Sequence, residues 1–185
     1  MTYTSNQEFQ MTKLEKDGAI FLIGLSASGK TTLAHLLVQK MRDQNIPCFL
    51  MDGCEMNQQE ILPKFRGHDI ESRKQRAIYL IKLVNWIASQ SIVPVVAVIG
   101  QPASARKAWR EQIENYHEVY LKCDFDVCVN RDNKGLYQAA LRGEKKSVIG
   151  LDIDFDEPES ADLILDSTFL TPQELLDKLW NDLTK

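Results

Sequence analysis

Residues 19–37, AIFLIGLSASGKTTLAHLL, carry the strongest structural signal in this chain. The stretch begins with AIFLIG, a short apolar run closed by glycine, which is typical of a strand buried on both faces. GLSASGKT at residues 24–31 then fits the pattern G-x-x-x-x-G-K-[ST], and a helical stretch at 30–44 follows it. A strand, a glycine-rich turn and a helix in this order are the context that identifies a phosphate-binding loop, or P-loop.

The residue types of this loop predict its chemistry. Backbone N–H groups of the turn and of the helix start surround phosphate oxygens, and Lys30 adds a positive charge at the β- and γ-phosphates. The hydroxyl of Thr31 is a suitable ligand for Mg²⁺. The loop therefore predicts a bound nucleoside triphosphate. The residues expected to hold it are Gly24, Ser26, Ala27, Ser28, Gly29, Lys30 and Thr31.

Four further apolar runs repeat the strand pattern around this loop. They are CFLMDG at 48–53, VPVVAVIG at 93–100, EVYLKC at 118–123 and ADLILDS at 161–167. Helical patterns separate them at 70–90, 103–115 and 124–130, and a last helix at 172–184 has a capping box that starts at Thr171. Strands that alternate with helices predict a three-layer α/β fold, with a parallel five-stranded sheet covered on both faces.

The length and the local composition divide the chain. A chain of 185 residues is the size of one α/β domain. We expect a polar N-terminal tail over residues 1–18 and a single domain over 19–185. Within that domain, residues 131–158 are charged, contain three glycines and show no clear period, so they are too long for a passive connection. We interpret them as a lid, called the lid segment below.

The overall charge excludes several classes of partner. The chain has 22 Lys+Arg against 26 Asp+Glu and no long block of like charge, so we expect neither nucleic acid nor a membrane surface as a partner. No apolar leader and no stretch of ~20 apolar residues is present, which favours a cytoplasmic protein. The four cysteines lack C-x-x-C spacing and are expected to be reduced thiols.

Asp52 is the second candidate for chemistry. It ends the predicted strand at 48–53, and in a parallel sheet it emerges at the same edge as the P-loop. An acid there can orient a water bound to Mg²⁺ or accept a proton from an attacking hydroxyl. The alternative is a turn residue that only precedes Gly53. The sequence makes Lys30 and Asp52 the catalytic candidates, and Thr31 and Asp52 the metal candidates.

Two segments carry a resemblance to a known family. RDNKGLYQAALRGEKKSVIGLDIDFDEPESADLILD at 131–166 is similar to the lid pattern R-D-P-K-G-L-Y, A-R-x-G-x-I-x-x-F-T-G and D-x-P-Y-E-x-P of adenylylsulfate (APS) kinases. GLSASGKTTLA at 24–34 resembles their G-L-S-G-S-G-K-[ST]-T-L-A. These P-loop kinases use ATP to phosphorylate the 3′-hydroxyl of adenosine 5′-phosphosulfate (APS). The resemblance spans about residues 19–170 and implies ATP, Mg²⁺, a small nucleotide acceptor and a homodimer.

The resemblance also implies roles for particular residues. Thr32 joins the residues that bind ATP and Mg²⁺, while Arg131 and Lys134 belong to the lid that closes over the nucleotide. Arg73 matches an arginine at the family's sulfonucleotide site, and Arg106 matches a basic position after the third strand. Asp52 matches the first acid of the family pattern D-G-D-x-x-R.

The acceptor site departs from the family pattern. Cys54 stands where the family has its second acid, and Asn57 stands where it has arginine. Val148 and, in a segment that aligns poorly, His68 replace two phenylalanines that sandwich the acceptor's adenine, and Gln101 stands in the family's S-P-x-R segment. Arg66 can compensate for Asn57. The candidate acceptor-binding residues are Cys54, Asn57, Arg66, His68, Arg73, Arg106 and Val148.

Three functional hypotheses follow from these residues. The favoured one is a kinase with APS as the acceptor. The second keeps the chemistry but uses another nucleotide, such as a cytidine diphosphate derivative, which needs less stacking area. The third is a non-catalytic nucleotide-binding module, which the missing acid at Cys54 invites. A P-loop protein that hydrolyses ATP for mechanical work is disfavoured because the chain is short and has no second nucleotide motif.

Overall fold

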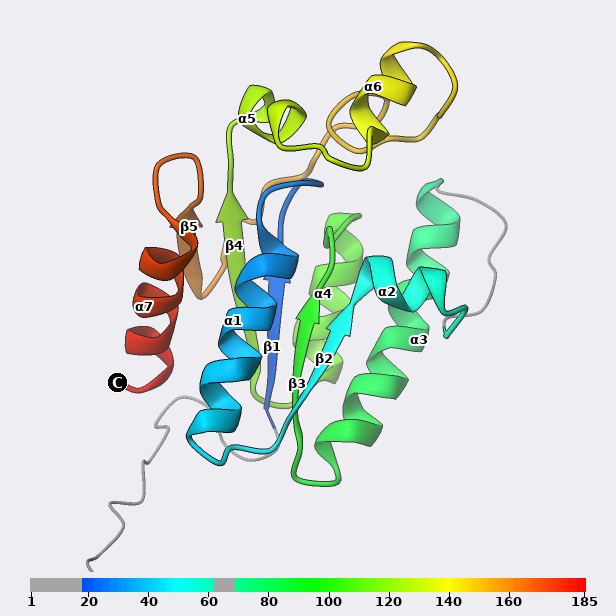
Figure 1. The fold of residues 1–185 in the computed structure, drawn as a ribbon. Helices are drawn as coiled ribbons and strands as arrows, with labels where there is room; N and C mark the ends of the chain where they lie inside the picture. The colour runs from blue at the N-terminus through cyan, green and yellow to red at the C-terminus, as the bar shows by residue number, and fades with distance from the viewer. Residues whose placement is uncertain (1–17, 62–68) are drawn as a thin grey trace, which may run out of the picture.

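The computed structural model describes residues 18–61 and 69–185. Its centre is a five-stranded sheet in the order β2-β3-β1-β4-β5, and every neighbouring pair is parallel (Figure 1). This confirms the predicted parallel sheet. The strands are β1 Ala19–Ile23, β2 Cys48–Asp52, β3 Val93–Ala97, β4 Tyr116–Lys122 and β5 Leu163–Asp166.

Helices cover both faces of the sheet, as the three-layer prediction requires (Figure 1). Helices α1 (Lys30–Asp43) and α7 (Pro172–Leu183) pack on one face, and α3 (Ile70–Ala88) and α4 (Ala103–Gln112) pack on the other. The five residues of β1 are all fully buried because Ile20 and Leu22 face the first pair of helices, while Phe21 faces the second. A strand buried on both faces has no polar alternation, which is why its sequence is continuously apolar.

Three short helices lie toward the carboxyl ends of the strands. They are α2 (Gly53–Gln58), α5 (Phe125–Asn130) and α6 (Leu136–Leu141). The sequence predicted α5, but it indicated only a turn after β2 and no regular structure within the lid segment. Helix α2 begins after Asp52 because that carboxylate accepts hydrogen bonds from the backbone N–H groups of Cys54 and Glu55. One side chain therefore starts a helix that is too short to show a hydrophobic period.

The capping box of α7 is present as predicted. Thr171 Oγ1 accepts a hydrogen bond from the Glu174 N–H at 3.3 Å, and Glu174 Oε2 accepts one from the Thr171 N–H at 2.8 Å. Pro172 occupies the first helical position, where no N–H is needed. Such a cap contributes about 1 kcal/mol and fixes where the loop after β5 ends.

Some predictions fall on residues that the structure does not describe. The expected polar tail lies almost wholly in residues 1–17, and Arg66 and His68 lie in residues 62–68, so all of these are outside the described residues. Within the described ranges, no helix combines the length and the apolar character that a membrane span requires.

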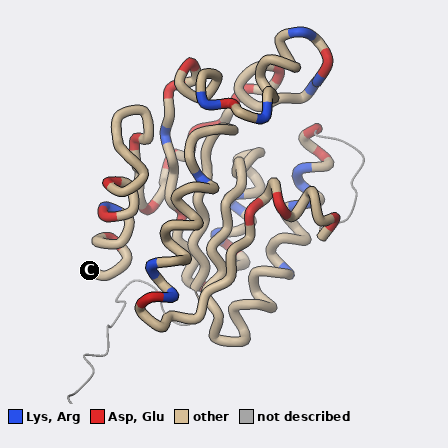
Figure 2. The backbone as a smooth tube through the Cα atoms, in the orientation of Figure 1, with Lys and Arg blue, Asp and Glu red and all other residues tan. Residues whose placement is uncertain are grey.

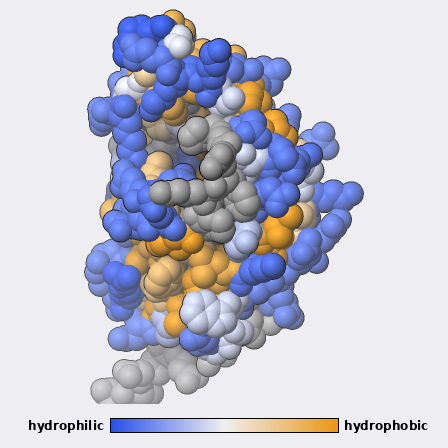
Figure 3. All heavy atoms as spheres, turned by 90° about the vertical axis from the view of Figure 1, so that its right-hand side faces the viewer, coloured by the Kyte–Doolittle hydropathy of each residue, from blue (hydrophilic) through white to orange (hydrophobic). Residues whose placement is uncertain are grey.

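The side of the molecule that carries α3 shows apolar side chains among polar ones (Figure 3). Three large apolar or aromatic residues of α3 are exposed: Ile78, Tyr79 and Trp86.

Candidate active site

The P-loop connects β1 to α1 and depends on two unusual backbone conformations. Gly24 has φ +147, and a Cβ at this position would lie 2.5 Å from the Leu121 carbonyl oxygen, so the loop can pass β4 only because residue 24 has no side chain. Gly29 has φ +99, and the helix begins directly after it. Ala27 has φ 60, which is uncommon for a residue with a Cβ. The loop thus packs closely against β4 and contains three residues with positive φ.

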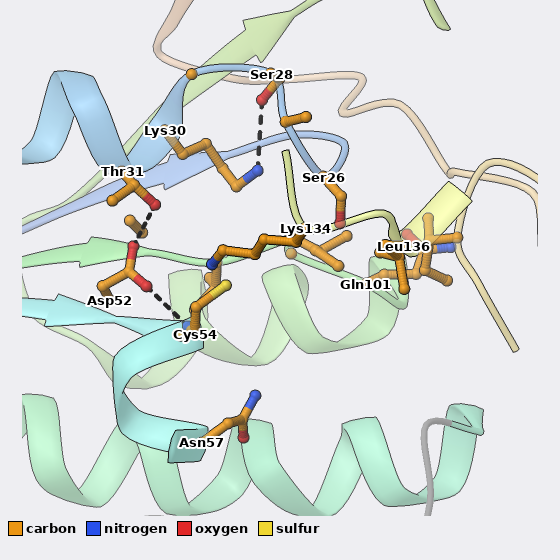
Figure 4. A pocket seen from close by; sticks show the side chains of 18 of the residues that line it. Ser26, Ser28, Lys30, Thr31, Asp52, Cys54, Asn57, Gln101, Lys134 and Leu136 are labelled. Atoms are coloured by element: carbon orange, nitrogen blue, oxygen red, sulfur yellow. Dashed lines mark hydrogen bonds between the residues drawn. The ribbon is translucent and has the colours of Figure 1, made fainter. Parts of the chain in front are cut away.

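Lys30 lies at the start of α1 with 8% of its surface exposed. Its ammonium donates hydrogen bonds to the Leu25 carbonyl oxygen at 2.5 Å and to Ser28 Oγ at 3.4 Å, so it folds back over the P-loop (Figure 4). Burial lowers the pKa of Lys30 to about 8, and the carboxylate of Asp52 is among the groups that oppose this shift. A phosphate group beside the ammonium would restore the positive charge that burial disfavours.

Asp52 ends β2 directly across the cleft from the P-loop. Its Oδ1 accepts hydrogen bonds from the N–H groups of Cys54 at 2.8 Å and Glu55 at 3.2 Å. Its Oδ2 accepts the Thr31 hydroxyl at 2.6 Å (Figure 4). Asp52 is therefore a helix cap that also lines the cleft beside the P-loop, and its role in chemistry stays a prediction. The carboxylate is held rigidly, with one oxygen directed at the P-loop residue that is the other metal candidate.

A cleft of about 1020 Å³ contains these side chains. Ligand pockets in proteins usually span about 300–1000 Å³, so this cleft lies at the upper end of that range. We call the part next to the P-loop and the start of α7 the P-loop half, and the part between the β2–α2 corner and α3 the α3 half. The P-loop half is lined by residues 26–32 together with Arg131, Ser167, Pro172 and Leu175.

Positive side chains surround the cleft although the chain carries a net charge of −4. Only two acids, Asp52 and Asp132, line the cleft among the described residues. The cations that line it are Lys30, Arg73, Arg76, Arg131, Lys134, Lys145 and Lys146. Several of them lie on the lid segment, above the carboxyl edge of the sheet (Figure 2). This local excess of positive charge fits ligands with several negative charges.

Several hydrogen bonds connect the lid segment to the body. The Tyr137 hydroxyl donates to the Ser26 carbonyl oxygen at 3.1 Å, and Arg73 Nη2 of α3 donates to the Ser147 carbonyl oxygen at 3.2 Å. Gln101 Nε2, after β3, donates to Asp156 Oδ2 at 2.8 Å. Beneath the lid segment, Tyr137 and Val148 pack with Cys123, Cys128 and neighbouring apolar residues in a small separate core. The lid segment thus lies over the cleft in contact with both of its halves.

The structure brings most of the predicted site residues together. Lys134 extends into the cleft from the lid segment, and Cys54 and Asn57 face it from α2 (Figure 4). Cys54 and Asn57 are exposed, while Val148 lines the cleft with only 5% of its surface exposed because most of its side chain packs in the core of the lid segment. Arg73 and Thr32 also line the cleft.

Arg106 requires a correction, because it does not line the cleft. It is 7% exposed, and its Nη1 donates to the Gly100 carbonyl oxygen at 2.6 Å. Gly100 lets this loop pack closely on β1, because a Cβ there would lie only 2.8 Å from Ile23 Cγ2, whereas Arg106 Cδ would be in ordinary contact at 3.5 Å. The guanidinium is therefore used to hold the loop after β3, and it is not available to an acceptor in this arrangement.

Sequence reasoning missed three residues that line the cleft: Arg76, Gln101 and Ser167. Arg76 lies one helical turn after Arg73, so the spacing in α3 was a usable signal. Gln101 and Ser167 follow the ends of β3 and β5, and the rule that located Asp52 applies to them as well. No motif marks Ser167, whereas Gln101 stands in the S-P-x-R segment of the family pattern.

Solved structures share this architecture. The chain superposes on the APS kinase of Mycobacterium tuberculosis, determined in complex with AMPPNP and APS, with a TM-score of 0.82 and 25% identity. The match covers 91% of this chain and 98% of that one. A parallel sheet with a P-loop after β1, an acid at the end of β2 and an overlying lid segment is the architecture of a P-loop kinase.

The sequence relatives narrow this class. A family model described as adenylylsulphate kinase matches residues 16–166. A probable adenylyl-sulfate kinase of Bacillus subtilis is 33% identical over 165 residues, which are 88% of this chain and 83% of that protein. The chain therefore belongs to the adenylylsulphate kinase family. A cytidine diphosphoramidate kinase of Campylobacter jejuni is also similar, with 35% identity over 149 residues, 80% of this chain and 85% of that protein.

Proposed function

We propose that this protein, an ATP-dependent kinase for a nucleotide hydroxyl, transfers the γ-phosphate of ATP to the 3′-hydroxyl of APS. The observation that carries the proposal is the cluster of Lys30, Thr31 and Asp52 at the P-loop, with Thr31 and Asp52 joined at 2.6 Å. Phosphoryl transfer requires positioning and charge neutralisation more than covalent help from the protein. This cluster supplies both without the second acid that Cys54 replaces.

The residues present fit Mg²⁺. The Thr31 hydroxyl and the Asp52 carboxylate are oxygen ligands on facing elements, and Mg²⁺ in kinases takes one or two such ligands together with phosphates and water. When bound, the ion would neutralise charge on the β- and γ-phosphates. Lys30 contributes a further positive charge at these phosphates, and Asp52 orients the acceptor's hydroxyl or accepts its proton.

The α3 half is the proposed acceptor site. Arg73 and Arg76 of α3 and Lys145 and Lys146 of the lid segment bring four positive charges to it, which suits a nucleotide with two adjacent anionic groups. Cys54 and Asn57 are placed to contact the same molecule from α2.

One observation favours a second candidate acceptor, a cytidine diphosphate derivative. Val148 lies where the resemblance places a stacking phenylalanine, and most of this smaller side chain is buried in the core of the lid segment. A smaller stacking surface suits a pyrimidine better than adenine. The Campylobacter jejuni relative named cytidine diphosphoramidate kinase supports the same alternative.

The test is ADP release from ATP with each acceptor. Purified protein is incubated with MgATP and with APS, cytidine diphosphoramidate or no acceptor. We expect release that depends on APS. If ADP is released only with cytidine diphosphoramidate, the reaction is the proposed one but the acceptor is the cytidine nucleotide. If the protein binds nucleotide but releases no ADP in any mixture, a non-catalytic module is favoured.

We also propose that the protein is a cytoplasmic homodimer. The support is the resemblance described above, although one related APS kinase, from Thiobacillus denitrificans, is described as hexameric. Light scattering at several protein concentrations measures the assembly, and a monomer or a hexamer would contradict this proposal.

A further inference from the structure

The phosphate-binding N–H groups of the P-loop need a fixed direction, and two peptide units of the loop are intrinsically free to turn. The Ser28–Gly29 peptide precedes a glycine, which adopts positive and negative φ with similar ease. The Ser26–Ala27 peptide precedes Ala27, whose φ of 60 is disfavoured for a residue with a Cβ. Without an external constraint, either peptide could rotate and turn its N–H away from a phosphate.

Two hydroxyl groups from outside the motif supply such a constraint. Ser167 Oγ donates to the Ser28 carbonyl oxygen at 2.8 Å from 139 residues away in the sequence, and the Lys122 carbonyl oxygen is a second, more distant acceptor at 3.1 Å. The Tyr137 hydroxyl donates to the Ser26 carbonyl oxygen at 3.1 Å from 111 residues away. Ser167 is 1% exposed and Tyr137 is 0% exposed. Burial raises the pKa of the Tyr137 hydroxyl, so the group stays protonated and remains a donor.

Planarity of the peptide bond converts these contacts into a direction for the N–H groups. In a trans peptide the C=O and the N–H point in opposite directions, so a bond that holds the Ser28 carbonyl also fixes the Gly29 N–H. The Ser26 carbonyl fixes the Ala27 N–H in the same way. Among the described residues, neither of these two N–H groups has a hydrogen-bond partner, so both are available to a ligand.

The two hydroxyls are themselves held firmly. The Ser167 N–H donates to the Lys122 carbonyl oxygen at 2.8 Å, and the Ser167 carbonyl oxygen accepts Arg131 Nη1 at 2.9 Å. The Tyr137 ring packs edge-on against Phe125, with ring centroids 5.1 Å apart, and the Tyr137 N–H donates to Asp132 Oδ2 at 2.7 Å. Ser167 lies after β5, and Tyr137 lies on α6 of the lid segment.

We propose that Ser167 and Tyr137 are positioning residues that hold the Ser28 and Ser26 carbonyls and so keep the Gly29 and Ala27 N–H groups directed at the phosphates of ATP. The inference rests on the proposed function, since it takes ATP as the ligand of the P-loop. It adds two residues outside the motif to the machinery that binds the triphosphate. It also links the shape of the loop to the lid segment, through Tyr137 directly and through Arg131 on the Ser167 carbonyl.

The test uses Ser167→Ala and Tyr137→Phe, each of which removes one hydroxyl and little else. Calorimetry measures the Kd for MgADP, and steady-state assays measure KM for ATP, KM for the acceptor and kcat. We expect each variant to weaken MgADP binding and raise KM for ATP roughly tenfold, because a buried carbonyl loses its partner and the loop loses its constraint. KM for the acceptor should stay within about twofold, a split that general destabilisation would not produce.

Two matched controls isolate the hydroxyl contacts. Thr168→Ala removes the neighbouring hydroxyl, whose oxygen accepts the Asp124 N–H instead of contacting the P-loop. Tyr79→Phe removes a phenolic hydroxyl from the exposed side of α3. Both controls should bind MgADP as the unmodified protein does. Melting temperatures without nucleotide show whether a variant is folded. If Ser167→Ala is unfolded, the nucleotide affinity of Tyr137→Phe tests the positioning role.

The outcomes separate this inference from the proposed function. If the unmodified protein binds MgADP and both folded variants bind it within twofold as tightly, the positioning role is wrong while the kinase assignment stands. Equal losses for ATP and acceptor would also overturn it. If the unmodified protein itself binds no nucleotide, the proposed function fails, and the inference fails with it.

Discussion

The two halves of the cleft offer a ligand different kinds of chemical group. The P-loop half uses backbone N–H groups, whose direction depends on Gly24, Gly29 and the helix start. The α3 half is lined by side chains such as those of Arg73, Arg76, Cys54 and Asn57. Backbone recognition tolerates little change in sequence because it depends on rare conformations, whereas side chains can be exchanged one at a time. The first half keeps the family's P-loop pattern except at Ala27, which stands at φ 60 where the family has glycine, while more of the departures gather in the second half.

The largest expected effect tests the P-loop half. Lys30→Ala removes the positive charge at the β- and γ-phosphates, and we expect kcat/KM for ATP to fall on the order of 10³-fold, because such preorganised charges stabilise the transition state as well as the ground state. Steady-state kinetics measures this fall. Lys134→Ala, which removes an exposed cation of the lid segment, should cost much less. Equal losses in the two variants would contradict the special position of Lys30.

The next effect concerns Asp52, which lies between the halves. Asp52→Ala should lower kcat by ~10²-fold while ATP affinity stays within a few fold, the range for a positioned acid–base group. Asp52→Asn keeps an oxygen that can accept the Cys54 N–H and so preserves the start of α2. If Asp52→Asn were as active as the unmodified protein, Asp52 would serve only as a helix cap.

A smaller effect tests whether the substitutions in the α3 half set the acceptor. The double variant Cys54→Asp, Asn57→Arg restores the acid and the arginine that the family pattern has at these positions. With APS as acceptor, we expect kcat/KM to rise by about tenfold, the gain for one charge-assisted contact to an anion. KM for ATP should not change. A fall in activity with APS would indicate that these two positions are adapted to another acceptor.

The last effect is a dependence of nucleotide binding on pH. The pKa of Lys30 is lowered to about 8, and a bound phosphate raises it, so the protonated form binds more tightly. MgADP affinity should be constant below pH 8 and fall by up to about tenfold per pH unit above it. Calorimetry between pH 7 and pH 9.5 measures this. The variant Lys30→Arg, whose cation does not titrate in this range, should show no such fall, and a fall of equal size would exclude Lys30 as its cause.

The sequence predicted the frame of the molecule but only part of the site. The five parallel strands, the covering helices and the P-loop were predictable because continuous apolar runs and one motif encode them locally. Helix α2 was missed because a single side chain, Asp52, creates it. Arg106 was placed at the acceptor on a positional match, but its hydrogen bond to the Gly100 carbonyl oxygen is visible only in three dimensions.

The residues that sequence reasoning missed share a physical cause. Ser167 and Tyr137 contact P-loop carbonyls from more than one hundred residues away, and a contact at that separation leaves no local pattern. Tyr137 is the tyrosine of the lid pattern R-D-P-K-G-L-Y, yet nothing in that pattern shows where its hydroxyl points. Gln101, which follows β3, donates a hydrogen bond to Asp156 of the lid segment, a contact between residues far apart in the sequence. Tertiary hydrogen bonds therefore complete a site that the motif begins.

The central claim is that this cleft moves a phosphoryl group from ATP to a nucleotide hydroxyl. The most direct measurement follows radiolabel from the γ-phosphate of ATP in a single turnover, with APS or cytidine diphosphoramidate as the acceptor. We expect one labelled nucleotide for each ADP formed, with the label on a ribose hydroxyl, and no transfer by Lys30→Ala. Label recovered only as inorganic phosphate, or left wholly in ATP with every acceptor, would contradict it.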